Sequence, residues 1–187
     1  MRIFTDFDIV PDTYAKRAPQ SAQVDGTPVA SFPFTVEQIP SQAAYLSWEF
    51  VDPDSIPVCG FQWIHWSLAN LPLELARQQL QASANAADAL AIPADFSRRL
   101  PKLIPGVPQG KTSAASKFVG SSNLAVTERY NGPTPPDQTH EYLLRVWATS
   151  EPLPGLQEGF WLNALEGAVR KSPSVVACAE VWLPARA

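Results

Sequence analysis

Two stretches of the chain hold the side chains best suited to bind or transform a small polar molecule. The first contains Asp52, Asp54 and His65, and the second contains His140, the only other histidine among the 187 residues. An imidazole beside a carboxylate has its charged form favoured, so the two stretches would form a partly cationic pocket if they meet. Such a pocket binds an anion. Its carboxylates would also hold an ammonium or a hydroxyl, which favours a zwitterion such as phosphoethanolamine.

The second stretch also carries a proline-rich run before its histidine. Prolines at 133, 135 and 136 would give the pocket a rigid rim without spare N–H groups, and Gly132 would let the backbone come close. Each residue also has a purely structural explanation, such as a turn, a stiff loop or a hydrogen-bonded histidine at a strand end. The predicted ligand-binding residues are Asp52, Asp54, His65, Gly132, Pro133, His140 and Tyr142.

Two other kinds of site use the same residue types. Two histidines and two aspartates could ligate zinc or iron, but the spacing of His65 and His140 matches no compact ligand motif, so no metal is predicted. A hydrolase or lyase that uses a His–Asp pair stays open. The chain has no Gly-x-Ser-x-Gly, Walker or Rossmann motif, so no cofactor is predicted, and binding without catalysis is favoured.

Composition limits the class of protein and its partners. A chain of 187 residues with 45% hydrophobic and 17% charged residues predicts one globular domain over residues 1–187. The net charge of −4 and the lack of a basic stripe argue against a nucleic-acid partner. Neither an export signal nor an apolar run of about 18 residues is present, which predicts a cytoplasmic protein without a membrane span.

The chain has two cysteines, Cys59 and Cys178. In a protein without an export signal, two reduced thiols are favoured over a disulfide. Cys59 lies between the aspartates and His65 and could edge the pocket. The favoured interpretation is a small, half-buried hydrophobic residue.

Hydrophobic periodicity predicts the elements that position these side chains. Alternation predicts strands over residues 44–52, with Asp52 on the buried face, and over 142–148, with His140 in phase. Residues 60–71 are apolar on both faces, which predicts a central strand with Trp66 and His65 on opposite faces. Further strands are predicted near residues 3–7, 32–36 and 174–183, with a turn at 25–26.

Helix is predicted for two segments. Residues 73–90 suit one surface helix or two short ones, and residues 158–171 suit a helix with basic residues at its end. Proline density predicts turns and extended segments over 1–43, and an irregular segment over 92–122.

Four short motifs, taken together, carry a family resemblance. They are Asp52-Pro53-Asp54 with Pro57, then Trp63-Ile64-His65-Trp66 leading to Asn70-Leu71-Pro72, then Tyr130-Asn131-Gly132-Pro133-Thr134-Pro135-Pro136, and His140-Glu141-Tyr142. Their order and spacing resemble the phosphatidylethanolamine-binding protein (PEBP) family, in its bacterial Raf-kinase-inhibitor-like branch. The resemblance covers about half of the chain, and the combination is more specific than any single motif.

The resemblance implies a fold, a ligand and partners. The fold would be a mainly β, sandwich-like domain with Greek-key connections and a few peripheral helices, and residues 73–122 would be a variable cover. The pocket would place Asp52, His65, Pro133, His140 and Tyr142 around an anionic head group. A protein partner such as a kinase and a homodimer are further implications.

Overall fold

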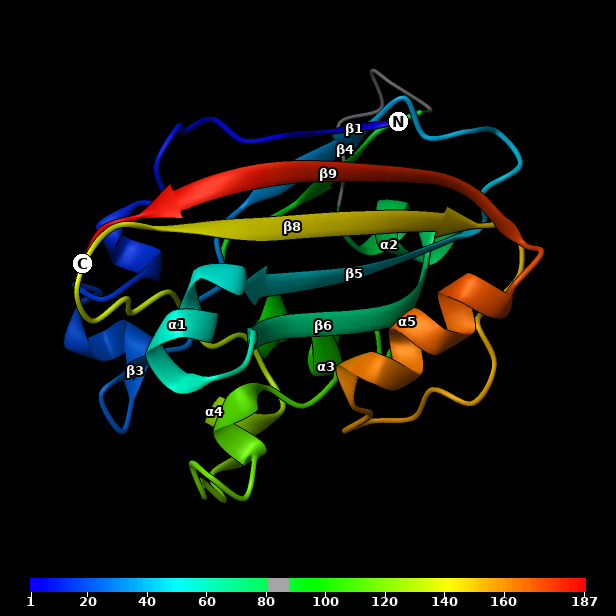
Figure 1. The fold of residues 1–187 in the computed structure, drawn as a ribbon. Helices are drawn as coiled ribbons and strands as arrows, with labels where there is room; N and C mark the ends of the chain where they lie inside the picture. The colour runs from blue at the N-terminus through cyan, green and yellow to red at the C-terminus, as the bar shows by residue number, and fades with distance from the viewer. Residues whose placement is uncertain (81–87) are drawn as a thin grey trace.

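Two antiparallel sheets form the framework of the fold (Figure 1). The computed structural model describes residues 1–80 and 88–187. The larger sheet has the order β6-β5-β8-β9 and consists of β5 (Tyr45–Asp52), β6 (Trp63–Pro72), β8 (His140–Thr149) and β9 (Val175–Ala185). The smaller sheet has the order β1-β4-β7 and consists of β1 (Arg2–Phe4), β4 (Phe34–Glu37) and β7 (Leu90–Ile92). The mainly β fold is therefore confirmed.

Short elements complete the architecture. A two-stranded hairpin, β2 (Gln23–Val24) and β3 (Thr27–Pro28), turns at residues 25–26 as predicted. The helices are α1 (Ile56–Cys59), α2 (Leu73–Gln79), α3 (Phe96–Leu103), α4 (Leu124–Thr127) and α5 (Leu162–Lys171). Strand β8 pairs with β5 rather than with β6, the strand of this sheet that precedes it in the chain. The connection between β6 and β8 therefore leaves the sheet and returns to its middle.

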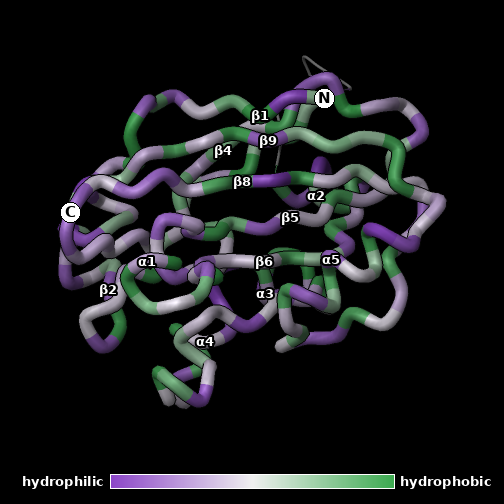
Figure 2. Tube along the Cα trace, in the orientation of Figure 1, coloured by the Kyte–Doolittle hydropathy of each residue, from purple (hydrophilic) through white to green (hydrophobic). Residues whose placement is uncertain are grey.

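The main core lies between the two sheets. Aromatic side chains dominate it, and Trp48 meets Trp66 edge to face with ring centroids 5.0 Å apart. Phe34 of β4 contacts both rings from the opposite sheet. A smaller cluster on the other face of the large sheet includes Leu165 of α5. Figure 2 shows hydrophobic residues along the strands, interspersed with hydrophilic ones.

The segment predicted to be irregular contains a helix. Helix α3 forms over Phe96–Leu103 although Pro101 lies inside it. Proline lacks the N–H that would bond to the carbonyl of Ser97, and that carbonyl instead accepts a hydrogen bond of 3.0 Å from Nε2 of Gln109. The buried amide of Gln109 also accepts from Trp66 Nε1 at 2.9 Å. A distant side chain thus replaces the missing helical bond, which the local proline count could not indicate.

The helix predicted over residues 73–90 is confirmed in its first part only. Helix α2 covers Leu73–Gln79, and residues 90–92 belong to β7. The part of the prediction that falls on residues 81–87 lies outside the described residues. The helix predicted over 158–171 begins four residues later, at Leu162.

Strand β6 is an edge strand, so its prediction as a central strand is wrong. Its free edge is covered by irregular backbone. The N–H of Gly110 donates to the carbonyl of Ser67 at 2.9 Å, and the N–H of Asn131 donates to that of His65 at 2.8 Å. Cover of this kind satisfies the backbone groups of an edge without a neighbouring strand.

A β-bulge interrupts β6 at His65. Phe50 of β5 faces Trp66, whereas the next residue, Val51, faces Ile64, so His65 is the extra residue. Trp66 packs in the main core and Ile64 in the cluster on the other face. His65 packs against Phe50 and Tyr142 of the main core, so it lies on the same face as Trp66. The prediction that the two residues face opposite sides is therefore wrong, because the bulge breaks the alternation.

Candidate functional site

At one end of the large sheet, β5 ends and β6 and β8 begin beside α1 (Figure 1). A pocket of about 210 Å³ lies at this end of the sheet. Antiparallel pairing places these three strand ends together. The pocket is lined by Asp52, Ser55, Val58, Cys59, Trp63, His65, Thr134, Pro135, Pro136, His140 and Tyr142. The structure therefore brings together four of the seven predicted residues, namely Asp52, His65, His140 and Tyr142.

Asp52 and His140 form a buried pair. Oδ2 of Asp52 lies 2.8 Å from Nδ1 of His140, and the two residues are 4% and 1% exposed. Nε2 of His140 lies 3.2 Å from Oδ1 of Asp137. Burial opposes the charged imidazolium, but the hydrogen bonds and charges of Asp52 and Asp137 outweigh it, so the pKa of His140 is raised. The two carboxylates thus favour the imidazolium form of His140.

The local sequence explains the position of Asp52. Its backbone precedes a short 3₁₀ turn, Pro53–Ser55, and its Oδ1 accepts a hydrogen bond of 3.1 Å from the N–H of Ser55. Aspartate is a preferred cap and proline a preferred first residue of such a turn. Asp52 therefore has the structural role of a turn cap and still directs Oδ2 to His140.

His65 presents a neutral ring to the same pocket. Its Nδ1 lies 2.6 Å from the carbonyl oxygen of Asn131, which can only accept, so Nδ1 carries the proton. Burial lowers the pKa of His65 to about 4. The other ring nitrogen, Nε2, has no protein partner within the described residues and is an unpaired acceptor.

Tyr142 adds an unpaired donor. The side chain is fully buried, and its ring packs against His65 with centroids 5.1 Å apart. Its hydroxyl makes no hydrogen bond to any residue that the structure describes. Burial, the charge of Asp52 and the proximity of its carboxylate raise the pKa of Tyr142, so the hydroxyl keeps its proton. The approach of this carboxylate does not meet the geometry of a hydrogen bond.

The remaining three predicted residues lie outside the pocket. The carboxylate of Asp54 accepts from the N–H of Glu141 at 2.9 Å and so joins the turn after β5 to the start of β8. Gly132 is packed where a Cβ would lie 2.4 Å from the carbonyl oxygen of Tyr14, so its lack of a side chain serves contact with protein rather than ligand. Pro133 is buried beside it.

Several residues that contribute to the site were missed by sequence reasoning. Asn131 fixes the tautomer of His65 through its backbone carbonyl, which no side-chain pattern indicates. Asp137, three residues before His140, could have been found as a carboxylate within reach of that ring. Pro135 and Pro136 were predicted as part of the rim but not as ligand-binding residues, and they line the pocket, whereas Pro133 does not.

The charge of the pocket differs from the prediction of two cationic imidazoles. The carboxylates of Asp52 and Asp137 favour the charged form of His140 only, while burial keeps His65 neutral near pH 7. Two carboxylates contact His140, so the pocket is not positive overall. The hydroxyl of Tyr142 and Nε2 of His65 are a donor and an acceptor without a partner among the described residues.

Two further features of the described residues bear on function. Within residues 1–80 and 88–187, no three His, Cys, Asp or Glu side chains gather in a way that could hold a metal ion. In the same ranges, no helix combines the length and apolar character required to cross a membrane.

Comparison with solved structures shows the same fold in two bacterial proteins. YbcL of Escherichia coli, described as a new member of the mammalian PEBP family, aligns with a TM-score of 0.67 and 17% identity, covering 100% of this chain and 98% of its own. CT736 of Chlamydia trachomatis, described as a PEBP homolog, aligns with a TM-score of 0.64 and 21% identity, covering 98% of this chain and 95% of its own.

Comparison of sequences gives the family. YxkA of Bacillus subtilis (strain 168), an uncharacterized protein, is 40% identical over 154 residues, which are 82% of this chain and 81% of that protein. The family model described as phosphatidylethanolamine-binding protein matches residues 3–177. With the four motifs placed around one pocket, the chain belongs to the phosphatidylethanolamine-binding protein family.

Proposed function

We propose that this chain binds a small ligand with a phosphoryl or carboxyl group, anionic or zwitterionic in character, in the pocket beside α1. The observation that carries the proposal is an unpaired donor and an unpaired acceptor in one pocket, the hydroxyl of Tyr142 and Nε2 of His65. A buried polar group without a partner costs about 1–3 kcal/mol. The hydroxyl of Tyr142 is such a group, so a ligand that accepts from it removes this cost, and the same ligand can donate to Nε2 of His65. Family membership supports a binding or regulatory role in general.

The favoured form of a phosphoryl ligand is the monoanion. Its P–OH donates to Nε2 of His65, and a charged oxygen accepts from Tyr142. If the carboxylate of Asp137 moves away, Nε2–H of His140 becomes a second donor to the same anion. A dianion has no proton for His65. Because the second pKa of a phosphate monoester is about 6, affinity is expected to fall as the pH rises above that value.

A zwitterion fits better than a simple anion. Asp137 is 58% exposed and contacts His140 at the edge of the pocket. Once displaced by the phosphoryl group, its carboxylate is available to the ammonium of phosphoethanolamine. The ion pair would be weak in solvent, worth less than about 1 kcal/mol, but it would favour the zwitterion over inorganic phosphate.

A titration followed by NMR of the two histidine rings tests the proposal. Phosphoethanolamine and inorganic phosphate should both shift the ring signals of His65 and His140, and phosphoethanolamine should bind more tightly. Ethanolamine is the control, since it lacks the phosphoryl group and should shift neither ring. If neither ring responds to millimolar amounts of either phosphate compound, the proposal fails.

A hydrolase or lyase is a second candidate, favoured by the Asp52–His140 pair. A carboxylate bonded to Nδ1 orients the imidazole so that Nε2 can exchange protons with a substrate. A screen of phosphate and carboxylate esters would support this activity if turnover disappears in His140→Ala. Turnover that persists in this variant would exclude it.

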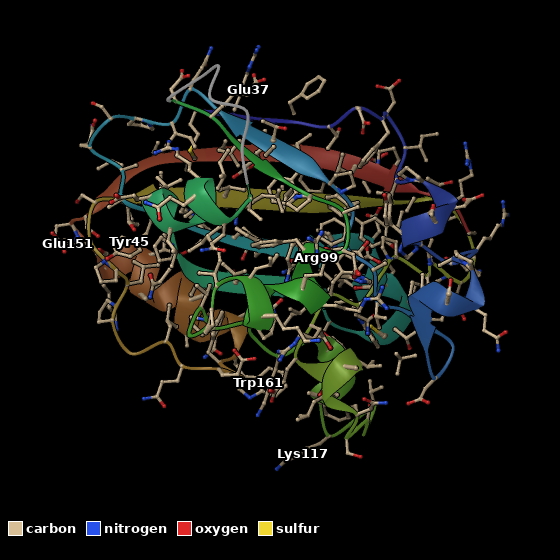
Figure 3. All side chains as sticks on the ribbon, turned by 180° about the vertical axis from the view of Figure 1, so that it is seen from behind. Glu37, Tyr45, Arg99, Lys117, Glu151 and Trp161 are labelled. Carbon is tan, nitrogen blue, oxygen red and sulfur yellow. The ribbon has the colours of Figure 1, made fainter. Side chains whose placement is uncertain are left out.

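A regulatory protein partner, such as a kinase, is a third candidate. The exposed Val58 of α1 lines the pocket. Phe118, which is 89% exposed, packs near Phe61, whose ring stacks on the pocket residue Trp63. Phe118 follows Lys117, which lies at the tip of a projecting turn (Figure 3). A pull-down that loses its partner in Phe118→Ser would favour this role, and an unchanged capture would argue against it.

A homodimer, a cytoplasmic location and a single folding domain remain predictions. Trp182 on edge strand β9 is an exposed apolar side chain that a symmetric contact would bury. Light scattering of the wild type and Trp182→Ser would test the dimer.

A further inference from the structure

Cys59 is a nucleophilic side chain in the pocket wall that the proposed binding mode does not use. It is the last residue of α1, it is exposed, and it lines the pocket. Its Sγ lies 3.3 Å from the carbonyl oxygens of both Ser55 and Phe61, to which the S–H can donate weakly. The structure thus places it at the pocket, and its interpretation as a half-buried hydrophobic residue does not hold.

The position of Cys59 is fixed by the turn that carries Asp52. Ser55 donates its N–H to Asp52, and its hydroxyl oxygen accepts from the N–H of Trp63 at 2.8 Å. Gly60 ends α1 in a left-handed conformation, with φ of +88°. The thiol is therefore held on the same short framework as the carboxylate that orients His140.

An independent observation points to an occupant beside this thiol. The fully buried hydroxyl of Tyr142 and Nε2 of His65 both lack partners among the described residues, and both residues line the pocket with Cys59. The pocket volume of about 210 Å³ corresponds to about seven waters at roughly 30 Å³ each. A group of several heavy atoms attached to Sγ would compete with a phosphoryl ligand for this space.

We propose that Cys59 is a modification site at which a low-molecular-weight disulfide closes the pocket. The thiolate of Cys59 attacks one sulfur of the disulfide, the S–S bond breaks, and a mixed disulfide forms on Cys59. The released thiolate takes the proton that Cys59 lost, so no external oxidant is required. An excess of free thiol reverses the step. The inference rests on the proposed function, since closure matters only if the pocket binds a ligand.

Cys178 provides a matched control within the same chain. It is also exposed, but it lies on β9 opposite Trp147, and it is not among the residues that line the pocket. Burial raises the pKa of its thiol, and the nearby carboxylates of Glu180 and Glu49 add to this against the opposing effect of Arg145. Since the thiolate is the reacting form, the raised pKa should slow formation of a mixed disulfide at Cys178.

The decisive experiment compares Cys178→Ser, which keeps only Cys59, with Cys59→Ser. Each full-length variant is treated with oxidised glutathione and analysed by mass spectrometry. It is also treated separately with methanethiosulfonates that attach a trimethylammonioethyl or a sulfonatoethyl group. The His140 ring is titrated by NMR in each product, and inorganic phosphate binding is measured before and after reduction.

In Cys178→Ser, glutathione should attach, phosphate affinity should fall by about tenfold or more, and excess dithiothreitol should restore it. The cationic adduct should lower the pKa of His140 relative to the anionic one, because a nearby positive charge disfavours imidazolium. In Cys59→Ser, neither the phosphate affinity nor the pKa of His140 should change on treatment with these reagents. Absence of the glutathione adduct, equal His140 pKa values for the two charged adducts, or unchanged phosphate affinity would each overturn the proposal.

Failure of the proposed function gives a different result. If unmodified protein does not bind phosphate, the binding proposal is wrong, and closure has no ligand to exclude. The comparison of the two charged adducts does not use a ligand. It therefore still supports or overturns the placement of a Cys59 adduct beside His140.

Discussion

Oδ2 of Asp52 lies 2.8 Å from Nδ1 of His140, and this contact joins the end of β5 to the beginning of β8. The two side chains are buried, so the hydrogen bond is little screened by solvent. It fixes which nitrogen of His140 faces the pocket edge, where Nε2 meets the exposed carboxylate of Asp137. The charge of the site is therefore set by His140, whose imidazolium form is favoured by two carboxylates.

Replacing Asp52 with asparagine should lower the pKa of His140. The amide removes the negative charge that favours imidazolium, while burial continues to oppose it. Phosphate affinity near pH 7 should fall as His140 loses its charge. NMR titration of the ring measures the first effect. Asp54→Asn is the control, because Asp54 bonds to the backbone of Glu141 rather than to the ring. Similar His140 pKa values in the two variants would contradict this account.

His65 should make the protein less stable as the pH falls. Its pKa is about 4 in the folded state, against an ordinary value of 6.5. Between these values the unfolded chain binds a proton that the folded chain does not, so the free energy of unfolding falls with decreasing pH, by at most about 3 kcal/mol. His65→Gln should remove this part of the slope. Urea denaturation at several pH values measures it, and an unchanged slope would count against a neutral buried ring.

Glu49 should have the opposite effect on how stability depends on pH. Its side chain is buried on the other face of the large sheet, and burial raises its pKa from 4.5 to about 7 despite the ion pair with Arg145. The folded chain then binds the proton more readily, so stability from this group is complete below pH 4.5 and is lost as the pH rises through about 7.

Glu49→Gln should therefore stabilise the protein above about pH 7, by up to about 3 kcal/mol, and have little effect near pH 4.5. The amide can still accept from Arg145, which keeps its second partner, Glu180. Thermal unfolding across this range measures the effect. Because His65 and Glu49 have opposing slopes in overlapping pH windows, the wild type should vary less than either single variant. A Glu49→Gln effect that does not grow with pH would be inconsistent with a raised pKa.

The alternation of apolar and polar residues along the strands predicted part of the site correctly. Asp52 and His140 follow the phase of their strands, and both are buried as expected. His65 could not be placed in this way, because a bulge inserts it between two paired positions. The role of Gly132 depends on the close approach of Tyr14, which is distant in sequence.

The same limit applies to the fold. Helix α3 could not be predicted over a proline-rich segment, because the side chain of Gln109 supplies the bond that Pro101 lacks. The edge position of β6 could not be predicted, because irregular backbone covers this edge and the strand therefore has the apolar sequence of a central strand. Long-range hydrogen bonds to irregular segments leave no periodic signal in the sequence.

Replacing Asp137 with asparagine should tighten phosphate binding. The carboxylate contacts Nε2 of His140 and would repel an incoming anion. The asparagine removes that charge, so affinity for inorganic phosphate should rise several-fold, in the range of a weak exposed ion pair of up to about 1 kcal/mol. Phosphoethanolamine should gain less, since its ammonium loses a partner. Calorimetric titration with both compounds checks this difference, and an equal gain for both would refute the predicted ammonium contact.

The last prediction concerns Tyr142, whose buried hydroxyl has no partner among the described residues. Tyr142→Phe removes an unsatisfied polar group, so the free energy of unfolding should be unchanged or higher by about 1 kcal/mol. The same change removes a donor to the ligand, and a hydrogen bond to a charged group is worth about 1.5–3 kcal/mol, so phosphate affinity should fall by about tenfold or more.

Thr149 offers a matched control for Tyr142, because its buried hydroxyl at the other end of β8 also lacks a partner within the described residues. Thr149→Val should leave stability unchanged or improved, as Tyr142→Phe does, but should not alter phosphate affinity. Comparing Tyr142→Phe with Thr149→Val distinguishes the loss of a ligand contact from the general effect of removing a buried hydroxyl. If Tyr142→Phe binds phosphate as tightly as Thr149→Val does, the ligand does not contact Tyr142, and the main support for the proposed binding mode is lost.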